Sequence, residues 1–192
     1  AIFLRACGMD FQSDDFNSFL NSWWSIIKLN DFTGLATQVG NYNIPYQVII
    51  YLMTLLPLNA LYAYKIVSII FDFALAISTA MLVYSFAKNN RRFKAILTYS
   101  AVLLSATVIF NSSFWAQCDS IYTSFIILAI LFLHKDKPIA SFVFIGIAFA
   151  FKLQTVFIIP VLLYYWISTK KISILHFFII PAVDVIMCLP AI

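Results

Sequence analysis

Polar side chains that suit group transfer to a hydroxyl interrupt the long apolar runs of this chain. Asp14 and Asp15 lie together in the stretch SDDFNSFL. A carboxylate within hydrogen-bond reach of an acceptor hydroxyl takes its proton as the oxygen attacks. A phosphate leaving group needs positive charge or hydrogen-bond donors where negative charge develops, and Lys152, Lys65 or Gln154 could supply them. The sequence therefore predicts Asp15 or Asp14 as a base and these donors as an anion-binding group.

The stretch NSSFWAQCDSIYTSF, residues 111–125, raises a second question. Asp119 lies between two apolar runs, where an unpaired carboxylate is costly. It follows Ser112, Ser113 and Gln117 and opens a predicted helix, so a role as a helix cap is one interpretation. A place in a water-filled cavity is the other, because ionisable groups inside membranes are tolerated there.

No rival catalytic pattern is present. The sequence has no Ser-His-Asp order with a supporting motif, no Cys/His spacing typical of a metal site and no Gly-rich phosphate loop. The three cysteines, Cys7, Cys118 and Cys188, are an odd number at unrelated spacings. They are interpreted as packing residues, as most free cysteines are.

The composition indicates an integral membrane protein. The chain is 63% hydrophobic and 10% charged, whereas a soluble domain is roughly a quarter charged. It contains 20 Phe and no Glu. The net charge of +4 therefore does not indicate a nucleic-acid partner, and basic residues are interpreted as signals of membrane topology. The expected fold class is all-α, a polytopic bundle of transmembrane helices.

Three basic clusters divide the chain into pairs of membrane runs. They lie at 88–94, 135–137 and 170–171, and the positive-inside rule assigns them to the cytoplasm. The long segment 9–44 carries four Asp against one Lys and is expected to be the first extracytoplasmic loop, with short interfacial helices. The expected membrane helices are 62–87, 95–113, 119–134, 138–151, 153–169 and 172–192, preceded by a short interfacial or re-entrant helix at 45–56.

Helix length places two charged residues near one membrane face. Run 119–134 gives about 24 Å of helix and run 138–151 about 21 Å, against a hydrocarbon core of about 30 Å. Both runs start from the loop at Lys135 and Lys137 and stop short of the far interface. Asp119 and Lys152 are therefore expected at similar depths, near the outer ends of two consecutive helices and facing one outward cavity.

Other residues are expected to have structural roles. Lys65 and Asp72 share one face of run 62–87 but lie about 10 Å apart along the helix axis, so Asp72 is expected to bond another helix. Trp23 and Trp24 are interpreted as interface anchors. The chain opens AIFLRACGMD without an initiator Met, and we expect 1–192 to be one transmembrane domain and a piece of a longer protein.

Several motifs, taken in order, carry a family resemblance. They are SDDFNSFL, GNYNIPY, AYKIVSIIFDFALA, FNSSFWAQCDSIY and GIAFAFKLQTVFIIP. The ordered set resembles the N-terminal half of GT-C class glycosyltransferases that use polyprenyl-phosphate sugars, particularly the bacterial relatives of the GPI mannosyltransferases. WAQCDSIY and AFKLQ are its most specific members. The resemblance covers nearly the whole chain and implies a GT-C-like fold.

The resemblance implies a membrane enzyme that transfers one sugar, mannose or another hexose, with inversion. The donor would be a polyprenyl-phosphate sugar and the acceptor a cell-surface glycan or a lipid-linked molecule, at the extracytoplasmic face of a bacterial plasma membrane among membrane lipids. In that class an Asp of the first outer loop is the base. Asp15 followed by Phe16 matches the second Asp of the Asp-x-Asp-aromatic motif, with Asp14 in the middle, whereas Ser13 replaces the first Asp. A divalent metal, Mg²⁺ or Mn²⁺, sometimes lies close to this Asp, and the replacement leaves the metal open.

The expected substrate contacts extend beyond the acidic pair. Trp115 is interpreted as an interface anchor like Trp23 and Trp24, with stacking on a sugar beside Gln117 and Asp119 as the other interpretation. The residues expected to bind substrate are Asp119, Lys152, Gln154, Gln117, Trp115, Lys65 and Tyr42. Two other classes stay open. Short helices with intramembrane charges also build the sites of secondary transporters, and a non-catalytic membrane subunit would share this composition.

Overall fold

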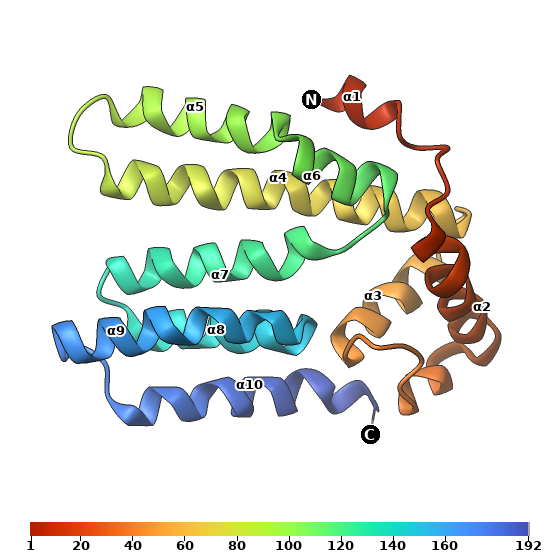
Figure 1. The fold of residues 1–192 in the computed structure, drawn as a ribbon. Helices are drawn as coiled ribbons and strands as arrows, with labels where there is room; N and C mark the ends of the chain where they lie inside the picture. Colours follow the sequence, from red (N-terminus) through yellow and green to blue (C-terminus); the bar gives the residue numbers. More distant parts are fainter. Residues whose placement is uncertain (192) are drawn as a thin grey trace.

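The computed structural model describes residues 1–191, and this part of the chain is all-helical, without a strand. Five helices pack side by side in the order α5, α4, α7, α8, α10. Figure 1 shows α2 and α3 grouped at one end of this row, beside the start of α4. The all-α expectation is confirmed. The expected run 172–192 ends at residue 192, which lies outside the described residues.

The helices from Ala60 onward, which include the five of the row, have well-defined bounds. They are α4 (Ala60–Phe86), α5 (Arg91–Leu104), the short α6 (Ala106–Ile109), α7 (Asp119–His134), α8 (Pro138–Phe151), α9 (Ile159–Thr169) and α10 (Ile179–Cys188). Single helical turns extend three of them: Phe110–Phe114 follows α6, Leu153–Ile158 precedes α9, and Ile174–Phe178 precedes α10. The helices α7 and α8 begin and end where the apolar runs 119–134 and 138–151 do.

Two helical segments are long and apolar enough to cross a membrane. Ala60–Phe86 has 27 residues and contains an 18-residue stretch with a mean hydropathy of 2.3, and Ile174–Ala191 has 18 residues and a mean hydropathy of 2.1. At 1.5 Å per residue these give about 40 Å and 27 Å of helix. A bent pair, Arg91–Leu104 with Ala106–Phe114, would make a third span. Asn59 caps the longest helix, because its side chain accepts a hydrogen bond from the Tyr62 backbone N–H at 2.9 Å.

The expected single helix 95–113 is wrong in two respects. Helix α5 begins at Arg91 and so includes part of the basic cluster, and the run bends by 50° after Leu104. At the bend, Ser105 has extended backbone angles, φ −62° and ψ 125°, and is the residue before the first turn of α6. Serine is common at this position because it readily leaves helical angles. The bend directs α6 toward the start of α4 (Figure 1).

The segment 9–44 is largely helical, and its large apolar side chains share one hydrophobic core with α3, the start of α4, the turn before α7 and the facing ends of α7 and α8. A helical run begins at Asp14, passes through a π-helical turn at Phe16–Leu20 and continues as α2 (Asn21–Asn30). The short helix α3 spans Ile44–Thr54, close to the expected 45–56. Trp23 and Trp24 are buried in this core, so their interpretation as interface anchors is wrong. They pack against Tyr42 and Tyr64, which the sequence pattern alone does not place beside them.

A buried ion pair joins α1 (Ile2–Ala6), α4 and α7. The carboxylate of Asp72 accepts hydrogen bonds from Arg5 Nε at 2.9 Å, Ser112 Oγ at 2.6 Å and Ser120 Oγ at 2.6 Å. Arg5 also donates to the Leu103 carbonyl at 2.9 Å. Arg5 and Asp72 are 1% and 0% exposed, a degree of burial that charged groups reach only when paired. Asp72 thus bonds other segments, as expected, and holds Ser112 and Ser120 on both sides of the turn between them.

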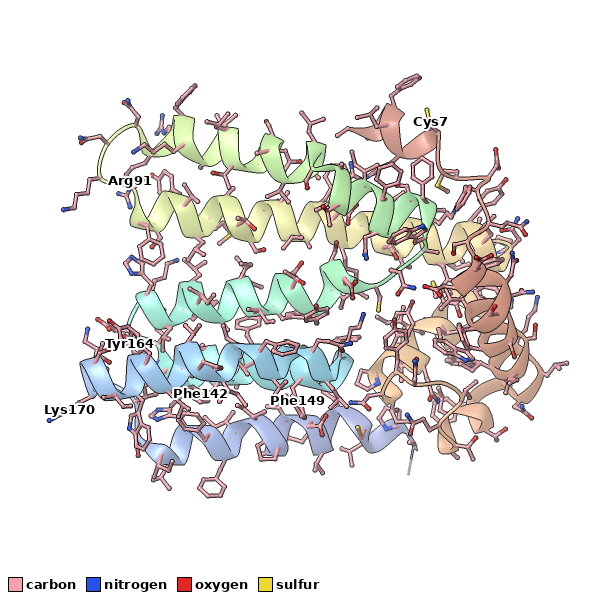
Figure 2. The ribbon with its side chains drawn as sticks, viewed as in Figure 1. Cys7, Arg91, Phe142, Phe149, Tyr164 and Lys170 are labelled. Carbon is pink, nitrogen blue, oxygen red and sulfur yellow. The ribbon has the colours of Figure 1, made fainter. Side chains whose placement is uncertain are left out.

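The basic clusters gather at one end of the row, opposite α2 and α3. Arg91 and Lys170 are labelled at this end in Figure 2, and the loop between α7 and α8, which holds Lys135 and Lys137, lies there too (Figure 1). The turn 111–119 lies toward the other end, where α7 begins. The alternation of charge along the chain therefore corresponds to two ends of the molecule.

This arrangement makes the membrane topology testable. We expect the 88–94, 135–137 and 170–171 loops to be cytoplasmic and the segments SDDF and WAQCDS to be extracytoplasmic, because short loops rich in Lys and Arg are retained inside. A cysteine introduced at Asn17 should react with an impermeant maleimide added to whole cells, and one at Arg92 should not. Both residues are exposed, so accessibility depends on the side of the membrane alone. Labelling at Arg92 without labelling at Asn17 would reverse this topology.

Candidate functional site

A cavity of about 670 Å³ opens where α7 begins and α8 ends, beside the α2–α3 end of the row. Its polar lining comes from four places in the sequence: the start of the helical run at Asp14, the loop before α3, the turn before α7 and the break after α8. Most residues that the sequence predicted for a site lie in this lining. They are Asp15, Tyr42, Trp115, Gln117, Asp119, Lys152 and Gln154.

Asp119 and Lys152 form an ion pair in this cavity. Asp119 is the first residue of α7, and Lys152 directly follows the last residue of α8 in an extended conformation, φ −153° and ψ 127°. Because α7 and α8 are antiparallel neighbours, these two ends meet. Asp119 also accepts a hydrogen bond from Asn111 Nδ2 at 2.9 Å. In the described residues its carboxylate accepts hydrogen bonds only from Asn111 and Lys152 and none from the backbone of α7. It therefore balances the charge of Lys152, and its own charge is also favourable near the positive end of the helix.

Lys152 keeps binding capacity beyond this pair. The side chain is 13% exposed, and its ammonium lies 5.2 Å from the centre of the Tyr42 ring and 5.7 Å from that of Tyr122, in cation–π contact. An ammonium has three donors, and in the described residues only Asp119 accepts from it. Two aromatic faces and one carboxylate thus fix a cation that still faces the cavity.

Asp15 is joined to the same cavity through a chain of two hydrogen bonds. Gln117 Nε2 donates to Asp15 Oδ2 at 2.7 Å, and the Tyr42 hydroxyl donates to Gln117 Oε1 at 3.0 Å. The amide of Gln117 is thereby oriented from both sides. No described residue donates to Asp15 Oδ1, so this oxygen is available to accept a proton from a bound hydroxyl.

Ser13 links Asp15 to the turn before α7. Its hydroxyl accepts a hydrogen bond from the Phe16 backbone N–H at 3.1 Å and donates to the Trp115 carbonyl at 3.2 Å. Ser13 stands where the Asp-x-Asp-aromatic pattern of the resemblance has its first Asp. Here it caps the helical run that begins at Asp14 and ties it to the wall of the cavity, so that Asp15 is held 102 positions before Gln117 in sequence but within hydrogen-bond distance in space.

Unusual backbone surrounds the site. A π-helical turn, Phe16–Leu20, directly follows Asp15, and a second, Phe110–Phe114, contains Asn111 and precedes Trp115. Isolated π-helical turns occur frequently at functional sites. Between Trp115 and Gln117, Ala116 has a left-handed φ of 57° and is fully buried. Non-glycine residues rarely adopt this conformation, and where they do the surrounding structure holds them in it.

Tyr42 and Cys118, which lie close to the Lys152–Asp119 pair, stay protonated. Burial, supplemented by the negative charges of Asp119 and Asp15, raises the pKa of the Tyr42 hydroxyl far above its ordinary value, so Tyr42 acts as a hydrogen-bond donor. Burial likewise raises the pKa of the Cys118 thiol to about 12. A thiol of this pKa is inert as a nucleophile at neutral pH, which agrees with its interpretation as a packing residue.

Two expected site residues lie outside the cavity. Lys65 is fully buried, and its ammonium donates to the carbonyls of Gly8 at 2.6 Å and Met9 at 3.0 Å and to that of Phe11. These bonds use all three donors, so Lys65 fixes the segment 8–11 that follows α1 and is not available to a substrate. Asp14 is exposed and is not part of the lining, because its neighbour Asp15 takes the position that faces Gln117.

The cavity also contains residues that sequence reasoning missed. Asn111, Asn41, Asn43 and Phe151 line it, as do the apolar residues of the turn after Lys152. Asn111 is the most informative: its Nδ2 bonds Asp119, its carbonyl accepts from the Gln117 backbone N–H at 2.8 Å, and its buried Oδ1 has no partner in the described residues. The GNYNIPY motif contains Asn41 and Asn43 on both sides of Tyr42, which was a usable signal.

The side chains do not match a metal site. Among residues 1–191, no three His, Cys, Asp or Glu side chains come together in a way that could hold a metal ion. Asp15 is bonded to Gln117, Asp119 is paired with Lys152, and Asp14 points elsewhere. A hard divalent cation prefers several oxygen ligands, and the described side chains of this cavity do not provide such a set.

Comparison with known proteins adds no relative to this description. The chain matches no protein-family model, no curated protein and no solved structure.

Proposed function

We propose that this chain is part of a polytopic membrane glycosyltransferase with a GT-C-like fold. In this proposal it transfers one hexose, such as mannose, from a polyprenyl-phosphate donor to a glycan or lipid-linked acceptor at the extracytoplasmic face of a bacterial plasma membrane. The observation that carries the proposal is that one cavity is lined both by Asp15, whose Oδ1 has no donor in the described residues, and by Lys152, whose ammonium donates there only to Asp119. Sugar transfer from a phosphate needs this combination.

The two groups would act on opposite sides of the anomeric carbon. Asp15 Oδ1 accepts the proton of the acceptor hydroxyl as its oxygen forms the new bond to that carbon. The bond to the donor phosphate breaks, and the electron pair stays on the phosphate oxygen. Lys152 stabilises the charge that develops there. Attack from the side opposite the phosphate inverts the configuration at the anomeric carbon.

The remaining polar side chains suit a sugar between these groups. Trp115 is 52% exposed beside the cavity, and an exposed aromatic face is suited to stack on the apolar face of a sugar ring. Gln117, Gln154 and Asn111 offer amide groups to its hydroxyls. Leu153, Val156 and Phe157 are exposed next to Lys152 and suit the isoprenoid chain of the donor.

A secondary transporter is the main alternative, and one observation favours it. The 50° bend between α5 and α6 resembles the broken helices that form transporter sites. Such sites lie near the membrane midplane, whereas this cavity lies at the ends of α7 and α8. The bend directs the 111–119 turn into the cavity wall, a role that needs no alternating access.

Formation of product tests the proposal directly. The purified full-length protein is incubated in detergent with radiolabelled polyprenyl-phosphate mannose or glucose and a set of glycan and lipid-linked acceptors, and the acceptor fraction is counted. We expect transfer that depends on both the donor and the acceptor. Uptake of labelled sugar into proteoliposomes without any glycosylated product would identify a transporter. The absence of both transfer and uptake would identify a non-catalytic subunit.

Lys152 provides a prediction about the donor. Lys152→Ala should raise the donor concentration needed for half-maximal transfer and slow the reaction, whereas Lys152→Arg should recover part of both because the charge remains. The loss of a group that stabilises developing charge costs roughly 10²- to 10³-fold. Lys28→Ala, which removes an exposed lysine of α2, is the control and should match the wild-type curve. A wild-type curve for Lys152→Ala would mean that Lys152 only pairs with Asp119.

A further inference from the structure

A second binding region lies at the opposite end of the molecule. An apolar groove of about 510 Å³ runs between the C-terminal half of α4 and the first half of α5. Its floor and walls are formed by residues spaced along one face of each helix, and Arg91 and Lys135 stand at its basic end. The apolar lining comprises Ile77, Ala80, Met81, Tyr84, Ala95, Ile96 and Tyr99.

This groove continues into a basic hollow. A separate cavity of about 680 Å³ is formed by the loop between α4 and α5, and it shares Tyr84 and Arg91 with the groove. The hollow is lined further by Lys88, Arg92 and the two asparagines of the loop. An apolar groove that borders a cationic hollow, with Tyr84 and Arg91 in both linings, has the polarity of an amphiphile with an anionic head.

The cations of this region have no acidic partners in the described residues. The ion pairs of residues 1–191 are Arg5–Asp72, Lys152–Asp119 and Lys171–Asp136. No acidic residue occurs between Asp72 and Asp119 in the sequence. Within residues 1–191, no acidic side chain therefore pairs with the basic residues at the head of the groove.

Arg91 is held where the groove and the hollow join. Its Nε donates to the Tyr84 carbonyl at 2.9 Å, and its guanidinium carbon lies 4.6 Å from the centre of the Tyr84 ring. These contacts use one edge of the guanidinium and fix its plane, which leaves the terminal N–H groups for an acceptor. A planar fork of this kind binds two phosphate oxygens at once.

We propose that the α4–α5 groove binds one anionic phospholipid, with an acyl chain between Ile77 and Tyr99 and the phosphodiester in the hollow at Arg91 and Arg92. Charge complementarity favours this occupant over a zwitterionic lipid, because a headgroup ammonium would be repelled by Lys88 and Lys135. The region lies away from the Asp15–Lys152 cavity, and binding there is independent of the proposed transfer reaction.

Lipid binding to the purified full chain tests this proposal. Phosphatidylglycerol and phosphatidylcholine with the same acyl chains are titrated into the protein in detergent, and bound lipid is counted by native mass spectrometry. We expect one saturable phosphatidylglycerol and a clear preference over phosphatidylcholine. Arg91→Ala together with Arg92→Ala should weaken phosphatidylglycerol binding by about 25-fold, at roughly five-fold for each basic residue near an anionic lipid.

The controls separate a formed site from diffuse attraction. Lys137→Ala with Lys170→Ala removes two exposed lysines from the same end and should leave the preference unchanged. Ala95→Phe fills the groove, so it should lower the affinity for phosphatidylglycerol while the basic residues remain. Inorganic phosphate and glycerol phosphate should not compete. Equal binding of both lipids, an equal loss in both double variants, or displacement by free phosphate would overturn the proposal.

Discussion

Replacing Asp15 by asparagine lowers the rate of sugar transfer by roughly 10²- to 10⁴-fold, the contribution typical of a positioned general base. Asparagine keeps the size of the side chain and can still bond the Gln117 amide after a flip, but it cannot accept the acceptor's proton. The expected loss is therefore in turnover, with the donor concentration for half-maximal transfer little changed. Initial rates with radiolabelled donor, measured on the folded full-length variant, check this result.

Asp14→Asn is the matched control for this prediction. It removes the same charge from the adjacent position, which is exposed and outside the cavity, and it should retain most of the wild-type rate. Near wild-type turnover in Asp15→Asn, with unchanged thermal unfolding, would contradict the assignment of the base. A larger loss in Asp14→Asn than in Asp15→Asn would exchange the two roles.

The sequence predicted helix position better than helix shape. Long apolar runs bounded by charges located α7 and α8 at both ends, because Asp119, Lys135, Lys137 and Lys152 mark where apolar chain stops. The bend at Ser105 was not predicted, because a run of apolar residues continues through it. A single serine is compatible with a straight helix, and the surrounding packing decides whether its backbone leaves helical angles.

In the candidate site, too, some residues were placed correctly from the sequence and others were not. The sequence predicted that Asp119 and Lys152 lie at similar depths and face one cavity, because two short helices that leave one loop end at matched depth. The ion pair between them was not predicted. Lys65 was predicted to bind substrate, and this is wrong. Its partners are backbone carbonyls of residues 8, 9 and 11, and main-chain acceptors cannot be recognised from the types of the side chains. The choice of Asp15 over Asp14 likewise depended on a partner 102 positions away, Gln117.

The burial of the tryptophans illustrates a limit of composition. Trp23 and Trp24 lie in a segment whose acidic residues indicate an outer loop, and amphipathic tryptophans are enriched at membrane interfaces. In the structure they fill the core between α2, α3 and the start of α4. A loop that carries several large aromatic residues can pack them into the core of the helices beside it, because each buries a large apolar area.

Loss of Asp72 should destabilise the protein and misplace its site. Asp72→Ala leaves Arg5 buried without its counter-ion, a change that typically costs about 3–5 kcal/mol, and it frees Ser112 and Ser120. Thermal unfolding of the detergent-solubilised protein should shift strongly downward. Asp136→Ala, which breaks the exposed pair with Lys171, is the control and should leave the unfolding temperature unchanged.

A double variant separates stability from positioning. Replacing Arg5 by methionine and Asp72 by leucine removes the uncompensated charge, and apolar replacements of buried ion pairs are often neutral or stabilising. Stability should therefore recover. Transfer should remain slow, because Ser112 and Ser120 no longer share the acceptor that holds the two sides of the turn carrying Gln117 and Asp119. Full recovery of transfer together with stability would show that Asp72 serves the fold alone and that the turn is positioned by Ser13 and Asn111.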